Sequence, residues 1–495
     1  MSWKILSQIS RFASTATQNV TKSAPKILDF KQIPGPKYYP ILGSLNDFIQ
    51  LGKNERLHLT VDEMHQKYGN IFRIRIESID AVFLSSADYI RSIFAYEGKY
   101  PKHPIPPAWL YFNEKFNIQR GLIFMNDEEW LQHRQIMNTF LLKDMKWTES
   151  LIEMTCDNFI GKLKRILDSE DATVVENLED ELYLWSIYSI LNLMLGSSTS
   201  QQSDREFDAT VWEFVTIVKQ IFDSSSKLMS IPPRFADKIH MKVYKDFENA
   251  AQKSISISRR LISILSNDMQ SSENGLLQKM RSQHLSEDMI VRIFSDLIIA
   301  AGDTTVTTLQ WMLHSIAKDS QLQDKLRKTI TDEPGNLESP LIRASLRESL
   351  RLYPIAPFVG RFIENDATIG GYGIPKGVLT IASLYTSGRD PMNFTDSHKF
   401  IPDRWLRNGD QGEHKVFKSH ATLPFAMGSR SCVGKKIASY QIHCLISKIL
   451  KEFTLESKNK EDVNFKLKLI GVPDKKILIA FRTTMPFTID VNVNP

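Results

Sequence analysis

One cysteine of the chain lies in a segment suited to holding it as a ligand. Phe425–Gly434 reads FAMGSRSCVG, so glycines bracket the stretch that contains Cys432. The apolar stripe that follows predicts a helix over 435–453, whose N-terminal N–H groups and dipole lower a thiol pKa and stabilise the thiolate. A thiolate held by such a loop is a suitable axial ligand for haem iron. Cys156 and Cys444 lack these surroundings and are expected to be small buried hydrophobes.

Two pairs of side chains recur at helical spacing. Glu348 and Arg351 lie three positions apart in a predicted helix, so they share one of its faces. At the surface such an ion pair contributes little to stability, whereas a buried pair would destabilise the protein strongly if one partner were removed. Trp130 and Arg134 lie four positions apart and also share a face. The guanidinium of such a pair is suited to binding carboxylates.

An unusually long helix is predicted over 286–318, with a length of about 50 Å at 1.5 Å per residue. Such a helix would cross the whole domain. Its middle, Ala300–Thr305, combines small residues with threonines, whose hydroxyls compete for backbone carbonyls, so a bend or a widened turn is expected. Small residues allow a cofactor to approach the backbone closely, or alternatively allow helices to pack. Asp303 and Thr304 add a carboxyl and a hydroxyl group there.

The elements that must position these residues are mainly helical. The chain has 495 residues, of which 42% are hydrophobic and 24% charged, an ordinary globular composition. The stretches 71–76 and 81–84 predict a short strand pair, and period-2 alternation over 465–481 predicts a hairpin. Most of 125–330 follows helical patterns. The breaks predicted in the helical region and directly after it are 197–206, 231–233, 268–275 and 331–339.

The N-terminus carries most of the net charge. Residues 1–28 hold four bases, no acid and many serines and threonines, which indicates a mitochondrial presequence over 1–30. The alternative is a disordered basic tail. Four of the five net positive charges lie there, so the remaining chain is nearly neutral and composition gives no sign of a nucleic-acid partner. No stretch approaches the roughly 20 apolar residues that cross a bilayer.

In their order along the chain, these motifs resemble those of cytochromes P450. Phe425–Gly434 resembles the haem-binding loop, and Glu348–Arg351 resembles the ExxR pair. Phe400–Trp405 resembles the aromatic-x-Pro-acid-Arg segment, and Trp130–Arg134 resembles WxxxR. The resemblance implies a monooxygenase whose single haem-thiolate domain covers 31–495. The implied fold is mainly α with small peripheral β-sheets, and a long central helix lies over the haem.

The resemblance also assigns roles to residues. Cys432 would ligate the iron of haem b, and Asp303 and Thr304 would deliver protons during dioxygen activation. A network of Glu348, Arg351 and Arg404 would lock the cysteine loop in place. The other residues expected at the haem are Trp130, Arg134, Arg361, Phe425, Arg430 and Gly434, the arginines pairing with its propionates. Two positions depart from the family pattern, because Ala301 and Ala426 stand where glycine is usual.

Two basic pairs resemble the mitochondrial class of the family. Arg343 and Arg347 share a helix face, and Lys435 and Lys436 follow the cysteine. In that class such residues dock an acidic [2Fe–2S] ferredoxin, which receives electrons from an NADPH-dependent ferredoxin reductase; the alternative is an ordinary solvated face. The resemblance places the enzyme on the matrix side of the inner membrane. Met229–Phe235 would dip into a leaflet or form a buried connector.

The substrate is expected to be a lipophilic steroid. The segments 121–142 and 296–305 are most similar to arthropod enzymes of ecdysteroid synthesis, with the 2-hydroxylase as first choice and the 22-hydroxylase as second. A haem-thiolate isomerase and a non-catalytic haem protein are the alternatives. The acid–alcohol pair and the basic pairs argue against the first, and the complete motif set argues against the second.

Overall fold

The computed structural model describes most of the chain. Residues 1–26 fall outside the described part, so the presequence over 1–30 stays a prediction. The described ranges are 27–37, 54–76, 79–119, 121–170, 173–199, 205–267, 274–333, 335–406 and 416–484.

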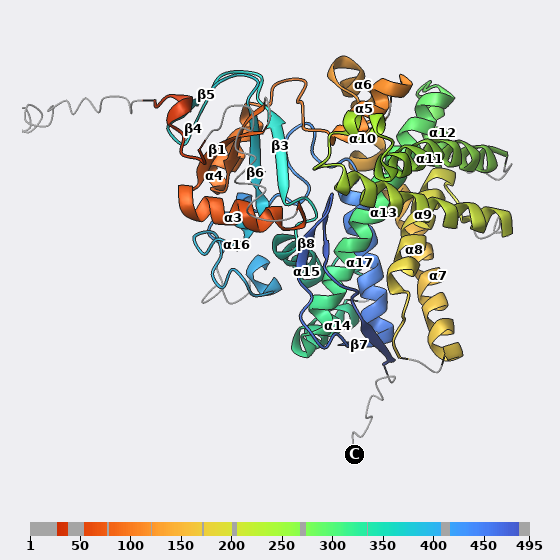
Figure 1. Ribbon diagram of the computed structural model, residues 1–495. Coiled ribbons are helices and arrows are strands. Elements are labelled where there is room, and N and C mark those ends of the chain that lie inside the picture. The colour runs from red at the N-terminus through yellow and green to blue at the C-terminus, as the bar shows by residue number, and fades with distance from the viewer. Residues whose placement is uncertain are drawn as a thin grey trace, which may run out of the picture.

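A small mixed sheet occupies one side of the molecule (Figure 1). Its order is β1 (Ile71–Ile76), β2 (Ile79–Leu84), β6 (Leu379–Ser383) and β3 (Phe358–Phe362). Strands β2 and β6 run parallel, and the other two pairs are antiparallel. The strand pair predicted over 71–76 and 81–84 is therefore confirmed. Hydrophobic clusters form around the sheet, where α3 (Leu57–Tyr68) contacts β1 and α4 (Ala87–Ala95) contacts β6.

Helices make up most of the rest of the fold, beside three two-stranded sheets in the described ranges, and the prediction of a mainly helical protein is confirmed. Most of these helices share one large hydrophobic core. The helices are α5 (Pro107–Phe116), α6 (Asp127–Asn138), the π-helix η3 (Thr139–Lys143), α7 (Lys146–Glu170), α8 (Leu178–Leu195), α9 (Arg205–Lys227), α10 (Pro233–Lys238), α11 (Lys242–Asn267), α12 (Leu276–Ser282), α13 (Glu287–Ala317), α14 (Ser320–Asp332), α15 (Pro340–Leu352), α16 (Leu384–Arg389) and α17 (Lys435–Glu452).

Helix α13 runs through the middle of the helical part and contacts α8, α9, α11, α15 and α17 (Figure 1). Its N-cap is Ser286, whose side chain accepts from the N–H of Met289, and the helix runs from Glu287 to Ala317, close to the predicted bounds. The sequence predicted a bend or a widened turn near Ala300–Thr305; there is no widened turn, because α13 is α-helical throughout. The threonine hydroxyls instead bind carbonyls one turn back, Thr304 to Ala300 at 2.6 Å and Thr308 to Thr304 at 2.7 Å.

The predicted C-terminal hairpin is wrong. Strand β8 (Phe465–Leu467) pairs with β9 (Gly471–Pro473), and β10 (Ile479–Thr483) pairs with β7 (Phe453–Ser457). A tight turn after β8 supplies a nearer partner, closed by the N–H of Lys468 donating to the carbonyl of Ile470 at 2.9 Å. Strand β7 directly follows α17, and its first side chains alternate between buried and exposed, so it is a suitable partner for β10. Period-2 patterns identified the strands but not their partners.

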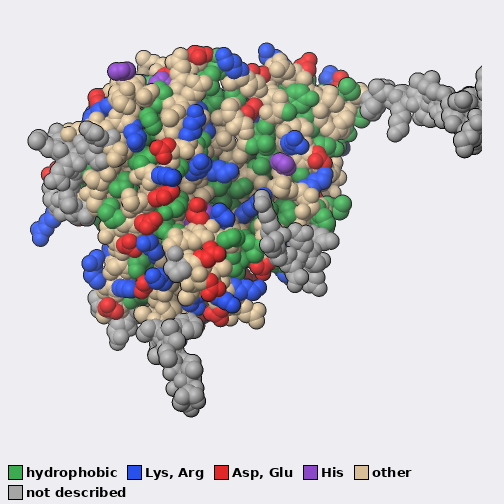
Figure 2. Space-filling view, turned by 180° about the vertical axis from the view of Figure 1, so that it is seen from behind, with side chains coloured by type: hydrophobic (Ala, Val, Ile, Leu, Met, Phe, Trp, Pro, Cys, Tyr) green, Lys and Arg blue, Asp and Glu red, His purple; other side chains and the backbone are tan. Residues whose placement is uncertain are grey.

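The surface agrees with a nearly neutral body. On the face shown in Figure 2, basic and acidic side chains are interspersed. Among the helices that the structure describes, none is both long enough and apolar enough to cross a membrane.

The end of α8 depends on a glycine. Gly196 follows the helix with φ of 80°, a left-handed conformation that costs side-chain-bearing residues about 1–2 kcal/mol. A Cβ at this position would lie 2.4 Å from the backbone nitrogen of Gly275, the residue before α12. The two chain segments therefore touch through their backbones, which leaves no room for a side chain.

We expect Gly196→Ala to lower the free energy of unfolding by roughly 2–5 kcal/mol, because backbone strain adds to a steric clash. Gly335→Ala is the control, since Gly335 has φ of 92° and a Cβ there would meet nothing within 4 Å. The control should lose only about 1–2 kcal/mol. Denaturant midpoints of the purified proteins measure both changes, and equal losses would contradict the contact between α8 and α12.

Candidate functional site

The loop before α17 presents Cys432 to an internal cavity. The N–H of Cys432 donates to the carbonyl of Phe425 at 2.9 Å, which closes the loop on itself. Gly428, within the loop, has φ of 79°, and Gly434 forms the N-cap of α17. The Cys432 side chain is accessible because it borders the cavity, although protein surrounds it. The local sequence thus folds into a tight loop that holds the thiol before a helix.

The pKa of Cys432 moves in the direction opposite to the sequence prediction. Burial raises the pKa of this thiol, and it outweighs the N–H groups of Gly434 and Lys435 and the charges of Arg134 and Lys435, which lower it. A helix N-terminus alone is therefore insufficient to make this group a thiolate. A metal ion bound to the sulfur would deprotonate it, because a coordinating thiol loses its proton.

The cavity has a volume of about 430 Å³ and gathers the residues predicted at the haem. Trp130 and Arg134 reach it from α6, and Thr304 reaches it from α13. Much of the remaining lining is apolar, which suits a large lipophilic group. All the predicted cofactor residues border this one space: Trp130, Arg134, Arg361, Phe425, Arg430, Cys432 and Gly434.

Two of the three cavity arginines are held by backbone carbonyls from distant parts of the chain. Arg134 Nη2 donates to Ser431 at 2.5 Å, and its Nε donates to Asn138 Oδ1 at 2.7 Å. Arg430 Nη2 donates to Met125 at 2.7 Å, and its guanidinium lies 4.2 Å from the centre of the Trp130 ring. Burial, followed by the charges of Arg361 and Arg134, lowers the pKa of Arg430 to about 10. The cations thus repel one another across the cavity wall.

The third arginine leaves a donor available. Arg361, on β3, donates from Nε to Glu97 Oε2 and from Nη1 to the carbonyl of Gly360, both at 2.9 Å. Its Nη2 is buried and has no hydrogen-bond partner among the described residues. A buried donor without a partner is costly, and three guanidiniums in one cavity favour an anionic ligand. The residues present therefore fit haem, with Cys432 for the iron and the arginines for its carboxylates.

Asp303 and Thr304 lie on different sides of α13. Thr304 borders the cavity, whereas Asp303 is buried outside its lining. Burial raises the pKa of Asp303 to about 7, the charge of Glu179 adds to the rise and that of Lys468 opposes it. The Asp303 carboxyl is therefore poised to hold and release a proton near neutral pH, next in sequence to a hydroxyl that borders the cavity.

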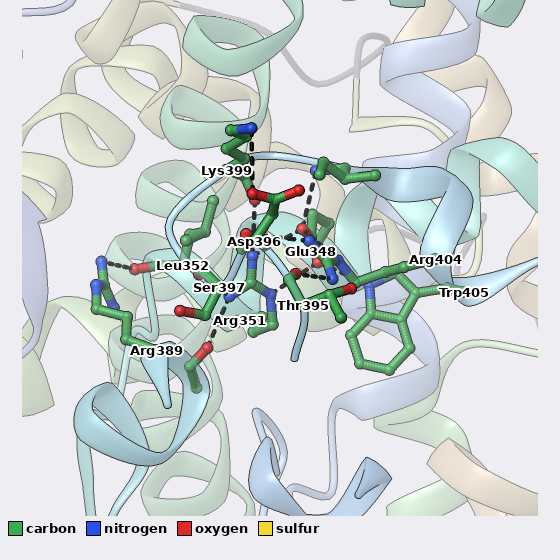
Figure 3. Close-up of polar contacts among 12 residues, drawn as sticks. Glu348, Arg351, Leu352, Arg389, Thr395, Asp396, Ser397, Lys399, Arg404 and Trp405 are labelled. Atoms are coloured by element: carbon green, nitrogen blue, oxygen red, sulfur yellow. Dashed lines mark hydrogen bonds and ion pairs between the residues drawn. The ribbon is translucent and has the colours of Figure 1, made fainter. Parts of the chain in front are cut away.

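A buried carboxylate organises the segment before the cysteine loop (Figure 3). Glu348 Oε1 accepts from Arg351 Nη2 at 2.7 Å and from Arg404 Nε at 3.0 Å. Arg351 Nε donates to Glu348 Oε2 at 2.9 Å. The backbone N–H of Ile401 and the indole of Trp405 complete the set at 2.9 and 2.8 Å. The structure thus brings the three predicted network residues together without exposed charge.

The two arginines of this network bind backbone carbonyls outside the cysteine loop. Arg351 donates to the carbonyls of Gly388, Ser397 and Lys399, and Arg404 donates to those of Thr395 and Asp396 (Figure 3). The contacts therefore fix 388–399, whereas the sequence predicted that they lock the cysteine loop itself. This irregular segment has few ladder hydrogen bonds of its own, so side chains supply the missing partners.

The predicted docking residues lie at the surface. Arg343, Arg347, Lys435 and Lys436 are all exposed, and α15 packs against α17. The guanidinium of Arg347 stacks 3.9 Å from the centre of the Trp405 ring, and partial desolvation by the surrounding protein lowers the pKa of Arg347. Arg347 is therefore held in place by a residue of the Glu348 network.

Sequence reasoning missed several residues of the site. Trp405 stood in a quoted motif, so its indole could have been assigned to the network. Glu97, Asn138 and His103 carry no local signal: Glu97 and Asn138 pair with arginines, and His103 borders the cavity. Burial lowers the pKa of His103 to about 4, so this ring is neutral at neutral pH.

The two departures from the family pattern have different outcomes. Ala426 has φ of 55°, a left-handed conformation that explains why glycine is usual there and that costs alanine about 1–2 kcal/mol. Ala301 borders the cavity, and its carbonyl accepts from Ser186 Oγ at 3.1 Å without backbone strain.

The chain is similar to known proteins over most of its length. A family model of cytochrome P450 matches residues 33–481. Cytochrome P450 315a1, mitochondrial, of Drosophila melanogaster is 36% identical, covering 91% of this chain and 88% of that protein. The mitochondrial 1,25-dihydroxyvitamin D(3) 24-hydroxylase of Rattus norvegicus is 28% identical, with coverage of 91% and 88%. The mitochondrial cholesterol side-chain cleavage enzyme of Ovis aries is 28% identical, with coverage of 92% and 89%. The chain belongs to the cytochrome P450 family, whose members are haem-containing monooxygenases.

Proposed function

We propose that the protein is a mitochondrial steroid hydroxylase that uses dioxygen and electrons from a [2Fe–2S] ferredoxin. The observation that carries the proposal is the cavity that gathers Cys432, three guanidiniums and Thr304. One thiol for iron, several cations for carboxylates and one hydroxyl are the groups that haem-dependent monooxygenation requires of a protein.

The residues of the site have two proposed roles, haem binding and proton delivery. Haem b would be held by Cys432 Sγ and by Arg134, Arg361 and Arg430, and once bound it supplies the redox chemistry that activates dioxygen. Thr304 Oγ1 offers a hydroxyl inside the cavity. The Asp303 carboxyl lies on another side of α13, holds a proton below about pH 7 and can release it above that pH.

The electron donor is assigned by charge. Arg343, Arg347, Lys435 and Lys436 form the proposed docking patch for an acidic ferredoxin, supplied in turn by an NADPH-dependent reductase. The mitochondrial relatives support the matrix side of the inner membrane as the location of the protein. Peripheral attachment draws support from Met229 and Phe235, which are 51% and 55% exposed and lie at or beside α10.

The proposed reaction is 2-hydroxylation of a 2-deoxyecdysteroid, with 22-hydroxylation as the second candidate. Support comes from the resemblance of segments 121–142 and 296–305 to arthropod ecdysteroid enzymes, from the Drosophila relative and from the apolar cavity. Turnover with ferredoxin, its reductase and a panel of deoxyecdysteroids, with products identified by mass and position, tests both. A rearranged product formed without reductant would favour an isomerase, and failure to bind haem or steroid would reject the assignment.

Cys432→Ser tests the ligand assignment. We expect the reduced protein with carbon monoxide to lose the red-shifted Soret band that thiolate ligation produces, because serine supplies no thiolate. Cys444→Ala is the control, since Cys444 is buried in the helical core away from the cavity lining. The control should retain the band. Retention of the band by Cys432→Ser would contradict the assignment.

Asp303→Asn and Thr304→Ala test proton delivery. The raised pKa keeps the Asp303 carboxyl protonated below about pH 7 and ionised above it, so turnover that uses this proton should fall as pH rises through 7. Asp303→Asn should lower turnover on the order of a hundredfold and remove this inflection. Thr304→Ala should consume NADPH without matching product. Product per NADPH across pH measures both, and an unchanged profile would remove the proposed roles.

Arg343→Gln with Arg347→Gln tests the docking patch. Loss of two positive charges should raise the KM for ferredoxin on the order of tenfold at low salt and less at high salt, because counterions screen the attraction. Lys245→Gln with Lys253→Gln removes the same charge from the exposed surface of α11 and should leave this KM unchanged. Equal effects of the two double variants would indicate only a general charge effect.

A further inference from the structure

A buried carboxylate outside every sequence motif joins two parts of the site. Glu97 follows α4 by two residues and is 5% exposed. Its Oε2 accepts from Arg361 Nε at 2.9 Å. Its Oε1 accepts from the backbone N–H of Ser429 at 2.9 Å and from the hydroxyl of Ser429 at 3.3 Å. One carboxylate thus binds β3 with one oxygen and the cysteine loop with the other.

The loop backbone passes directly against this carboxylate. A Cβ at Gly428 would lie 2.0 Å from Glu97 Oε1, and Gly428 has φ of 79°, so glycine is needed for both space and conformation. Further along the same segment, the carbonyl of Pro101 accepts from Arg430 Nε. The stretch 97–101 therefore holds the two loop residues that come three and two positions before Cys432.

Glu97 also determines which nitrogen of Arg361 is left to donate to a ligand in the cavity. Its carboxylate occupies Nε, and the carbonyl of Gly360 occupies Nη1, which leaves the buried Nη2 without a partner among the described residues. Both members of the pair are nearly inaccessible, with side-chain exposures of 5% for Arg361 and 6% for Glu97. Removing one member of such a pair strands the other charge in the protein, which is strongly unfavourable.

We propose that Glu97 is a positioning residue for the haem: it sets the conformation of the loop that carries Cys432 and aims Arg361 at the cavity. The proposal rests on the haem site proposed above. Glu97 acts through Ser429 and Arg361, so its loss changes how firmly haem is held and the potential of the iron. Partners of this kind typically change metal affinity on the order of tenfold to a hundredfold.

Two variants separate the two contacts of Glu97. Glu97→Gln keeps an oxygen acceptor for the Ser429 N–H but removes the negative charge. We expect the thiolate-type Soret band of the carbonyl complex to remain and the reduction potential to become more positive, because loss of an anion near the iron favours the reduced state. Glu97→Ala removes both contacts. We expect part of that band to be lost and haem to dissociate on the order of tenfold faster.

Glu364→Gln is the matched control. The Glu364 carboxylate packs against Gly98, next to Glu97, and its backbone N–H donates to Tyr96 at 3.2 Å. Substitution there removes a neighbouring charge while the contacts of Glu97 with Arg361 and Ser429 stay intact. The control should keep the wild-type band and haem dissociation rate, with a smaller change in potential than Glu97→Gln.

The measurements are the carbonyl spectrum, the reduction potential and haem transfer to an acceptor protein, all on purified holoenzyme. Values for both Glu97 variants equal to those of Glu364→Gln would overturn the positioning role. If Glu97→Ala does not fold, the potential of Glu97→Gln decides, and a value equal to the control overturns the proposal. A wild-type protein that lacks the thiolate-type band would overturn the proposed function itself, an outcome distinct from unresponsive Glu97 variants.

Discussion

The organisation of the site depends on one buried carboxylate, that of Glu348. Two guanidiniums, an indole and a backbone N–H satisfy its oxygens, and the ion pairs are shielded from solvent. Burial of charge costs several kcal/mol per ion unless such partners compensate, so the donating segments cannot shift independently. The remaining nitrogens of Arg351 and Arg404 bind the carbonyls of an irregular stretch. Side chains thereby replace the regular secondary structure that 390–399, directly after α16, lacks.

Glu97 repeats this arrangement nearer to the thiol. Glu348 holds the segment that precedes the cysteine loop, and Glu97 holds the loop through Ser429. Each carboxylate binds an arginine and a backbone N–H, so each couples an element of regular structure to an irregular one. The strained conformation of Ala426 persists in this setting, because contacts on the surrounding loop outweigh a cost of about 1–2 kcal/mol.

Helical spacing explains how much of this could be predicted from sequence. Glu348 with Arg351, Trp130 with Arg134 and the bounds of α13 follow from periodicity along one helix. The partner of β10 and the contact between Glu97 and Ser429 depend on segments far apart, 332 positions in the latter case. The pKa of Cys432 depends on how deeply the surrounding protein buries it, which no local pattern reports. Local motifs therefore identified the reactive groups, while tertiary packing determined their pKa values and the pairing of the strands.

Asp303 and Thr304 are neighbours on α13, yet they have different surroundings. Consecutive helical residues point about 100° apart, and of this pair only Thr304 borders the cavity, whereas Asp303 is buried outside its lining. Thr304 takes the cavity side, and Asp303 takes the side influenced by Glu179 and Lys468, whose side chains are 45% and 40% exposed. Helix α13 thus separates the apolar cavity from a side of the protein that carries charged residues. A carboxyl buried on this helix with a pKa of about 7 can hold or release a proton near neutral pH, as the proposed proton delivery requires.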